Sequence, residues 1–484
     1  MIQTPDWVRH AVFYQIFPDR FARSAKAPQL ANLEAWDAKP TNHGFKGGDL
    51  WGVIDKLDYL QDLGITAVYF TPIFQSTANH RYHTHDYYAV DPILGGNAAF
   101  SAMLEACHAR GIRVVIDGVF NHASRGFYAF NHILENGAAS PYVDWFHIKG
   151  YPLHAYEGKP LNYEAWWGIP ALPKFNTHNP AVRELIFDVA EHWIKLGVDG
   201  WRLDVPGEIN DDSFWQEFRR RVKAINPEAY IVGEIWHEAQ RWLKGDQFDA
   251  VMNYQFTKAC LGFFGGKNVD HALVNDTGYA PVPVMDGADF GRAILHTLGL
   301  YDYQVNTAQM NLLDSHDTAR FLSITKHDSS ALRLATLFQM TFPGAPSVYY
   351  GDEIGLQGGK DPDCRRGFPW DERHWDAPLR QFFKDAIELR RKHAVLRTGE
   401  FGFLMAEGDV VAYVRRSDDD VLIVVLNAGT DAVEIDLSAP PSLGIQPGQH
   451  AIGIFNSLGV YPIQAGMFTG VRVPERSGIV LRVK

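Results

Sequence analysis

The sequence predicts an α/β fold: a TIM (β/α)8 barrel with a small domain inserted after the third strand and an antiparallel β-sandwich at the C-terminal end. Short apolar runs typical of buried parallel strands alternate with amphipathic helical segments, which indicates the barrel. The alternation pauses once, in a stretch rich in aromatic residues, Gly and Pro, which indicates the insertion. After Leu396, short β-rich runs are separated by Asp, Gly and Pro, which indicates the sandwich. We expect four segments: residues 1–121 (barrel, first part), 122–178 (inserted small domain), 179–395 (barrel, second part) and 396–484 (sandwich).

The first part of the barrel is predicted from its cap and turn residues. VFYQIFP at 12–18 predicts a strand that ends at Pro18. Asp49 is an N-cap candidate for a helix that ends at Gly64, with apolar residues at helical spacing between them. The remaining elements are expected to be a strand at 67–72, a loop containing 80–88, a helix from about 98 to 110 and a third strand at 113–120.

The second part of the barrel resumes with a helix from Asn179, the N-cap, to Gly197, a C-terminal stop. Eight strands and the lack of a glycine fingerprint favour a closed barrel over a doubly wound open sheet, which is the alternative fold. A last helix is expected to end near His393. Further barrel strands are predicted at 200–205, 230–236, 248–256, 310–316 and 346–354, and sandwich strands at 410–416, 421–429, 432–438 and 478–484.

Composition and charge exclude several classes of protein. The 484 residues are 46% hydrophobic and 21% charged, which is typical of a globular chain with ample core. Aromatic residues make up 13% and include 13 Trp, enough to supply stacking surfaces for sugar rings as well as a core. The net charge of -12 disfavours a nucleic-acid partner, which would need a basic surface. Three widely separated cysteines support neither a disulfide framework nor a zinc cluster.

Neither a targeting segment nor a membrane segment is visible in the sequence. The N-terminal residues MIQTPDWVRHAVFY lack the cationic segment and apolar core of a signal peptide. No apolar run reaches the roughly 18 residues that a membrane-spanning helix needs. We therefore expect a cytoplasmic protein with no membrane partner.

Ionisable side chains gather where the predicted barrel strands end, which is where TIM barrels carry their catalytic groups. A turn-forming residue at one strand end is ordinary loop chemistry, whereas several ionisable groups at several strand ends indicate an active site. Reading along the strand ends gives Asp117, Asn121, His122, Arg202, Asp204, Glu234, His316 and Asp317.

Arg202 and Asp204 are two residues apart in one predicted strand, so both side chains lie on one face. A guanidinium beside a carboxylate favours the ionised form, so we expect Arg202 to lower the pKa of Asp204 and make it a good nucleophile. For such a pair taken alone, a structural ion pair is the preferred interpretation. Together with Glu234 and Asp317, however, Asp204 provides the paired carboxylates that glycoside hydrolysis requires.

Four motifs resemble those of the α-amylase family, glycoside hydrolase family thirteen. They are DGVFNH at 117–122, GWRLDV at 200–205, GEIW at 233–236 and LLDSHD at 312–317, in the order and spacing of the family. GGDLWGVIDKLDYL at 47–60 and GAPSVYYGDEIG at 344–355 resemble two further family regions. The resemblance spans about residues 7–395 and implies the same barrel, inserted domain and C-terminal sandwich.

The resemblance also implies a role for each matching residue. Asp204 is similar to the nucleophile that forms a glycosyl-enzyme, Glu234 to the general acid/base, and Asp317 to the third acid, which holds sugar hydroxyls. Such a retaining mechanism needs the nucleophile and the acid roughly 5–5.5 Å apart. Substrate-binding roles are implied for Tyr82, Asp86, His122, Arg202 and His316.

Within the family, the chain is similar to the neopullulanase, cyclomaltodextrinase and maltogenic amylase group. LPKFN at 172–176, Glu208 and GEIWH at 233–237 carry this similarity, and Glu208 and Trp236 join the predicted substrate-binding residues. The group cleaves α-1,4 and sometimes α-1,6 bonds in maltooligosaccharides, cyclodextrins and pullulan, and related family members act on starch. An additional β domain usually precedes its barrel and takes part in dimerisation. Here the barrel is predicted to start at residue 12, so we expect a monomer or a weak dimer.

No metal and no cofactor is expected. The family's structural calcium uses the Asn of the third-strand motif, an Asp of the inserted domain and a His carbonyl after the nucleophile strand. Asn121 is present, but Lys174 stands where that Asp belongs and Glu208 replaces the His. A cation at the site opposes Ca²⁺, which needs six to eight oxygen ligands. FARSAKAPQLAN at 21–32 also lacks the Asp residues of a second family calcium site.

Alternatives stay open at this point. His80, His83 and His85 have a spacing that would suit a metal, but no second cluster supports one, so loop or sugar-binding roles are preferred. A transglycosidase or isomerase would use the same covalent intermediate. A non-catalytic binding or transport-associated homologue is the alternative of another class, and it is disfavoured because the three acids are present.

Overall fold

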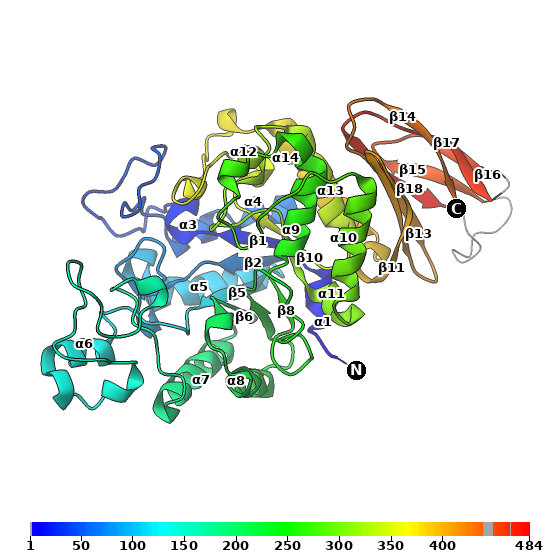
Figure 1. Ribbon diagram of the computed structural model, residues 1–484. Helices are drawn as coiled ribbons and strands as arrows, with labels where there is room; N and C mark the ends of the chain where they lie inside the picture. Colours follow the sequence, from blue (N-terminus) through cyan, green and yellow to red (C-terminus); the bar gives the residue numbers. More distant parts are fainter. Residues whose placement is uncertain (1, 439–448, 465) are drawn as a thin grey trace.

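The computed structural model describes residues 2–438, 449–464 and 466–484, and Figure 1 shows a barrel flanked at one end by a separate sheet. Eight parallel strands form the barrel in the order β8-β7-β6-β5-β2-β1-β10-β9. A parallel bridge between Met252 and Met310 joins the two outer strands and closes it. The strands are β1 (Phe13–Ile16), β2 (Ala67–Phe70), β5 (Arg113–Gly118), β6 (Gly200–Leu203), β7 (Tyr230–Gly233), β8 (Ala250–Val251), β9 (Met310–Leu312) and β10 (Ala345–Tyr349).

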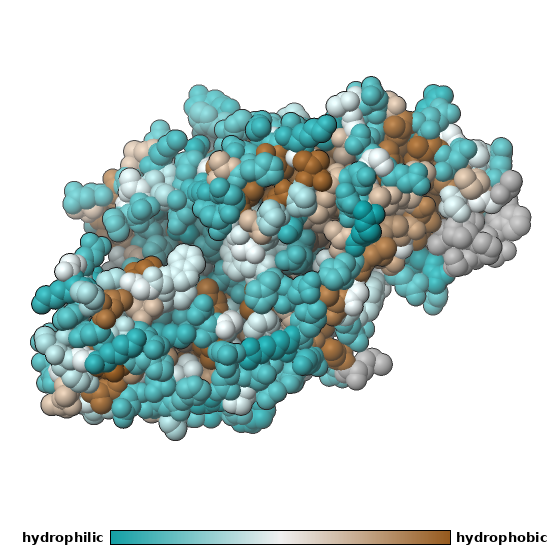
Figure 2. Space-filling view, viewed as in Figure 1, coloured by the Kyte–Doolittle hydropathy of each residue, from teal (hydrophilic) through white to brown (hydrophobic). Residues whose placement is uncertain are grey.

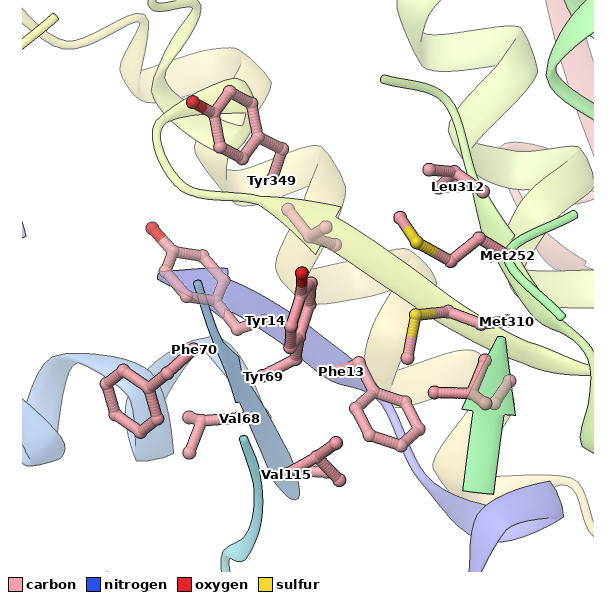
Figure 3. Packing of buried hydrophobic residues seen from close by; sticks show 14 of the residues in the cluster. Phe13, Tyr14, Val68, Tyr69, Phe70, Val115, Met252, Met310, Leu312 and Tyr349 are labelled. Atoms are coloured by element: carbon pink, nitrogen blue, oxygen red, sulfur yellow. The ribbon is translucent and has the colours of Figure 1, made fainter. Parts of the chain in front are cut away.

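The interior of the barrel is filled by apolar side chains from neighbouring strands, which Figure 3 shows from close by. Phe13, Tyr69 and Val115 come from three adjacent strands, share one face and are fully buried, whereas Val68 points to the other face of β2. Met252 and Tyr69 lie where this packing meets the ionisable side chains, because both contact the guanidinium of Arg202. The core therefore also forms the base on which the ionisable side chains rest.

Helices alternate with the strands and cover the outside of the barrel (Figure 1). The predicted caps are confirmed: the side chain of Asp49 accepts from the N–H of Gly52, and that of Asn179 accepts from two N–H groups of the following turn. The helix expected from Asp49 to Gly64 is divided at Lys56. The helices are α1 (Asp6–His10), α2 (Pro18–Phe21), α3 (Leu50–Asp55), α4 (Leu57–Leu63), α5 (Gly96–Ala109), α7 (Pro180–Lys195), α8 (Asp212–Ile225), α9 (Tyr254–Cys260), α10 (Gly287–Gly299), α11 (Tyr303–Ala308), α12 (Phe321–Ile324), α13 (Ser329–Thr341), α14 (Ala377–Lys392) and α15 (Val395–Thr398).

Two local features differ from the sequence predictions. Residues 80–88 were expected to be a loop, but β4 (Thr84–Val90) pairs with β3 (Phe74–Ser76) in a short hairpin. The strand predicted at 248–256 is only two residues long, because Asn253 caps α9 and the chain turns into the helix there.

The inserted segment at 122–178 leaves the barrel after β5 and lies at the opposite end of the molecule from the C-terminal sheet (Figure 1). It contains α6 (Tyr128–Asn136), which the sequence pattern did not predict. Isolated bridges, among them His122 with Lys174 and Phe146 with Phe175, hold its two ends together. Stacked and edge-on aromatic rings fill its small core.

The C-terminal strands form one antiparallel sheet in the order β11-β12-β13-β18-β15-β16-β17-β14. Apolar residues of β14 and β17 share one core cluster with those of β12, β13 and β18, so the sheet folds over on itself as a sandwich. On the face seen in Figure 2, hydrophobic residues gather toward this sheet, while most of the barrel surface is hydrophilic. The strands are β11 (Glu400–Glu407), β12 (Val410–Arg416), β13 (Val421–Asn427), β14 (Val433–Ser438), β15 (His450–Phe455), β16 (Val460–Gln464), β17 (Met467–Val473) and β18 (Ser477–Val483).

Candidate active site

Arg202, in β6, stands at the centre of a group of carboxylates that come from four barrel strands. Its guanidinium lies 2.9 Å from Asp117 Oδ2 and 3.2 Å from Asp204 Oδ1. On the other side, it lies 3.2 Å from Glu234 Oε2 and 3.9 Å from Asp317 Oδ2. We call these five residues the Arg202 cluster. The three acids predicted to be catalytic are therefore brought together around one cation.

The backbone after β6 is shaped to hold this arrangement. Val205, the residue after Asp204, has φ 36° and ψ 48°, a left-handed conformation that a β-branched residue rarely adopts. In this conformation, the N–H of Val205 donates to Glu234 Oε2 over 2.9 Å. Strained backbone persists where surrounding contacts enforce it and is concentrated at functional sites. Here it joins the ends of β6 and β7.

The sequence prediction for the pKa of Asp204 is wrong. Burial raises that pKa well above its usual value, and the neighbouring Glu234 carboxylate raises it further. Arg202 does act in the expected direction, but its charge is shared among four carboxylates and does not reverse the shift. Four acids around one buried cation favour retention of protons by the group.

Burial also raises the pKa of Glu234, and the charge of Asp317 adds to the shift, while Arg202 opposes it. Glu234 Oε2 is held by Arg202 and the N–H of Val205, whereas Oε1 accepts from the indole N–H of Trp236 over 3.1 Å. Trp236 is itself stacked on Tyr254, with ring centroids 3.7 Å apart. Trp236 therefore orients the oxygen that Arg202 leaves free.

His316 and Tyr82, both predicted site residues, lie side by side with stacked rings. The hydroxyl of Tyr82 donates to Asp117 Oδ2 over 2.9 Å, and His316 Nε2 lies 3.0 Å from Asp317 Oδ2. The other ring nitrogen of His316 is held by the side chain of Gln15 over 2.7 Å. Burial lowers the pKa of His316 well below its usual value, so the ring is neutral at pH 7.

His122 is placed at the end of β5, next to the inserted segment. Burial lowers its pKa to about 3, so this ring is also neutral at pH 7. It stacks on Trp166 with ring centroids 5.4 Å apart. Among the described residues its Nε2 is buried and has no hydrogen-bond partner, which leaves that atom available to a ligand.

Two predicted site residues are not brought to the Arg202 cluster. Asp86 lies on β4, is exposed, and accepts from the N–H of Tyr88. Glu208 is also exposed, and its carboxylate lies 3.5 Å from the ammonium of Lys174. Their roles as sugar ligands stay predictions.

Sequence reasoning missed two residues that the fold brings to the site, Arg365 and Tyr69. Arg365, in the loop after β10, lies 3.2 Å from Asp317 Oδ1 and contacts the backbone of His316. Tyr69 donates to Asp117 Oδ2 over 2.9 Å. His80, for which a loop or sugar-binding role was expected, is near Arg365, whose charge adds to burial in lowering the pKa of His80. Tyr69 lies at the C-terminal end of β2, so the strand-end rule could have found it, whereas no periodicity marks Arg365.

The residues implied for calcium lie where the inserted segment meets the loop after β6. The Oδ1 atom of Asn121 is buried without a partner in the described chain, which would suit a ligand atom. The ammonium of Lys174 donates to the carbonyl oxygen of Glu208 over 3.1 Å, so that oxygen already has a cationic partner. In the described ranges, no group of three His, Cys, Asp or Glu side chains is arranged to hold a metal ion.

In residues 2–438, 449–464 and 466–484, no helix combines the length and the apolar character that crossing a membrane requires.

Paired carboxylates at the C-terminal ends of TIM-barrel strands, gathered here around one arginine, are the arrangement of a glycoside hydrolase. The alpha amylase catalytic domain model matches residues 15–399, and the chain belongs to this family. It is 47% identical to a cyclomaltodextrinase from a Bacillus species, over 88% of this chain and 74% of the relative. It is 45% identical to neopullulanase 2 of Thermoactinomyces vulgaris, over 91% and 73%. A solved debranching enzyme from Nostoc punctiforme superimposes with a TM-score of 0.91, at 50% identity and with 99% of both chains covered.

Proposed function

We propose that the protein hydrolyses α-1,4 glucosidic bonds, and α-1,6 bonds where they occur, in maltooligosaccharides, cyclodextrins, pullulan or starch with retention of configuration. The observation that carries this proposal is the convergence of Asp204, Glu234 and Asp317 on Arg202 from three strands. The names of the cyclomaltodextrinase and neopullulanase relatives support the substrate class.

In the proposed first step, Glu234 acts as the acid. Its raised pKa favours the protonated form, and Arg202 holds Oε2, so the proton belongs on Oε1. That proton passes to the glycosidic oxygen as the bond to the anomeric carbon breaks, and the leaving sugar departs as an alcohol. Glu234 is then ionised, and its charge is compensated by Arg202.

Asp204, ionised beside Arg202 while Glu234 holds the proton that the two acids share, supplies the electron pair in the same step. Arg202 is the one side-chain partner of its carboxylate in the described chain, so Oδ2 is free to attack the anomeric carbon. The product is a glycosyl ester on Asp204. In the second step, water gives a proton to Glu234 and its oxygen replaces Asp204 at the anomeric carbon. Asp317 and His316, held together at 3.0 Å, are placed to bind hydroxyls of the same sugar.

A transglycosidase is the second candidate, because water and a sugar hydroxyl compete for the same ester. Hydrolysis and transfer use the same residues and the same ester, so the product depends on whether water or a sugar hydroxyl attacks the ester. Product analysis on maltotriose, β-cyclodextrin, pullulan and starch tests the proposal. Shorter saccharides from at least one of these glucans support hydrolysis, products longer than the substrate support transfer, and no reaction with any of them would overturn both.

A mechanism-based 5-fluoroglucosyl fluoride provides a direct test of the nucleophile. The wild type should acquire a sugar ester on a peptide that contains Asp204, and Asp204→Ala should not. A label found on Asp317 instead would reverse the two roles.

Several further expectations stay predictions. A monomer or weak dimer is checked by light scattering at micromolar concentration, and the cytoplasmic location by fractionation of the native host.

A further inference from the structure

An aromatic stack leads from the active site to the surface of the inserted segment. His122 stacks on Trp166, and Trp166 stacks on Trp167 with ring centroids 4.5 Å apart and an interplanar angle of 7°. Trp166 is half-buried, whereas Trp167 is 81% exposed. One face of the Trp167 indole is therefore against Trp166 and the opposite face is open to solvent.

The backbone at Trp167 is strained in order to hold this position. Trp167 has φ 51° and ψ 21°, a left-handed conformation that is an outlier for a bulky residue. The turn is closed on both sides, because Gly168 N–H donates to the carbonyl of Ala165 and Ile169 N–H donates to that of Trp166. Strain of this kind is kept where the surrounding structure enforces it, and it points to function rather than to stability.

A structural role does not account for Trp167. Single exposed apolar residues are common on protein surfaces. Trp167 differs from these because it is stacked, through Trp166, on His122 of the active site, and because its backbone conformation is unfavourable. It also buries little of its own area, so it adds little to the hydrophobic stabilisation of the fold.

We propose that Trp167, supported by Trp166 and His122, is a stacking platform for a glucose unit of an α-glucan chain outside the subsite where the bond is cleaved. One face of a glucose ring carries C–H groups, which pack on the electron-rich face of an indole. The indole N–H of Trp167 has no partner among the described residues and can donate to a sugar hydroxyl. This inference rests on the proposed function and specifies how longer substrates are held.

The platform predicts a dependence on chain length. Maltotriose fills the subsites around the cleaved bond, whereas maltoheptaose extends far enough to reach beyond them. Binding energy from remote units lowers KM for long substrates or raises their kcat. The quantity to measure is the ratio of kcat/KM for maltoheptaose to kcat/KM for maltotriose.

The test compares Trp167→Gly, Trp167→Phe and the control Tyr128→Ala. Tyr128 is another exposed aromatic residue of the inserted segment, but its ring contacts do not include His122 or Trp166. Trp167→Gly should lower the ratio about tenfold, as expected for loss of one ring contact. Trp167→Phe should restore part of it, and Tyr128→Ala should leave the ratio unchanged.

Thermal stability separates the platform from a structural role. Glycine accepts the left-handed conformation at no steric cost, so Trp167→Gly should keep or raise Tm while the ratio falls. An unchanged ratio, or a fall in Tm together with an equal loss on both substrates, would overturn the platform. Wild-type cleavage of both maltosaccharides in the same assay keeps such a result distinct from failure of the proposed function.

Discussion

Two groups of carboxylates in the barrel, each organised around a buried arginine, differ in which oxygens are left without a partner. In the second group, which we call the Arg320 cluster, Arg320 lies 2.8 Å from Asp352, with Asp314 and Glu353 beside it. Asp314 Oδ2 accepts from the N–H of Phe321, and Glu353 accepts from two tyrosine hydroxyls and a backbone N–H. Asp204 of the Arg202 cluster has one side-chain partner, and Asp317 is 28% exposed.

The difference teaches how to distinguish a reactive carboxylate cluster from a structural one. Burial raises the pKa of acids in both groups, so a shifted pKa does not separate them. In the Arg320 cluster, Asp314 and Glu353 fix the backbone after β9 and β10, and Asp314 Oδ1, which has no partner in the described chain, is buried. In the Arg202 cluster, Asp204 Oδ2 has no side-chain partner among the described residues and Asp317 is partly exposed, so a substrate can reach these carboxylates. Substitutions in the two clusters should therefore act on different observables.

The largest effect is expected for Glu234→Gln. The variant has no proton to give to the leaving oxygen, so kcat for maltotriose should fall about 10³-fold or more. A substrate with a good leaving group, such as an activated aryl maltoside, should lose much less in the first step. Glu353→Gln is the matched control in the Arg320 cluster and should keep kcat per folded molecule. Turnover of maltotriose by Glu234→Gln at the wild-type rate would contradict the assignment.

Stability should respond differently to substitution in the two clusters. Asp352→Asn leaves the Arg320 guanidinium without its ion-pair partner and should cost about 3 kcal/mol in the free energy of unfolding. Asp204→Asn leaves Arg202 with Asp117, Glu234 and Asp317 as ion-pair partners, so it should be neutral or stabilising at pH 7. Urea unfolding of the two variants and the wild type measures this contrast. Equal losses would remove the distinction between the clusters.

A smaller effect is expected on the pH dependence of activity. The indole N–H of Trp236 stabilises the ionised form of Glu234 and so lowers its pKa. Trp236→Phe keeps a ring to stack on Tyr254 but removes that donor, so the pKa of Glu234 should rise. Because Glu234 must be protonated to act, the basic limb of the kcat/KM profile should move to higher pH. A shift to lower pH would show that the contact favours the protonated acid instead.

The smallest effect is expected from removal of calcium. Lys174 already links the inserted segment to the loop after β6 through the carbonyl of Glu208. Dialysis against EDTA should therefore leave Tm and activity unchanged, whereas Lys174→Met should lower Tm by a few degrees. A loss of Tm on dialysis that added Ca²⁺ restores would reveal a site built from other ligands.

Sequence reasoning found the site because the strand-end rule uses only local pattern. Asp204, Glu234 and Asp317 follow short apolar runs, and the rule brings such residues together before any contact is known. Arg365 could not be found in this way, since it lies in an irregular loop and meets Asp317 only in the folded chain. The pKa of Asp204 was predicted with the wrong sign for the same reason, because acids from other strands add to its burial.

Prediction of the fold was limited in the same way, to elements that have a clear local pattern. The main barrel strands and helices were predicted from caps, glycine stops and apolar runs. The hairpin of β3 and β4 was missed because β3 is only three residues long and β4 (THDYYAV) shows no regular alternation of apolar and polar residues. Strands β11, β15, β16 and β17 were missed because their patterns are weak and partly exposed. Such elements are specified by their neighbours more than by their own residues.

The closure of the barrel between β8 and β9 bears on its hydrogen exchange. In the part of the chain that the structure describes, these strands share one bridge, and the side chain of Gln309 replaces a backbone acceptor for the N–H of Val251. By contrast, β1 and β2 are paired over four residues. Fewer backbone hydrogen bonds mean a lower free energy of local opening. Amide protons of Val251 and Met252 should exchange with deuterium sooner than those of β1, even though both regions lie in the same core.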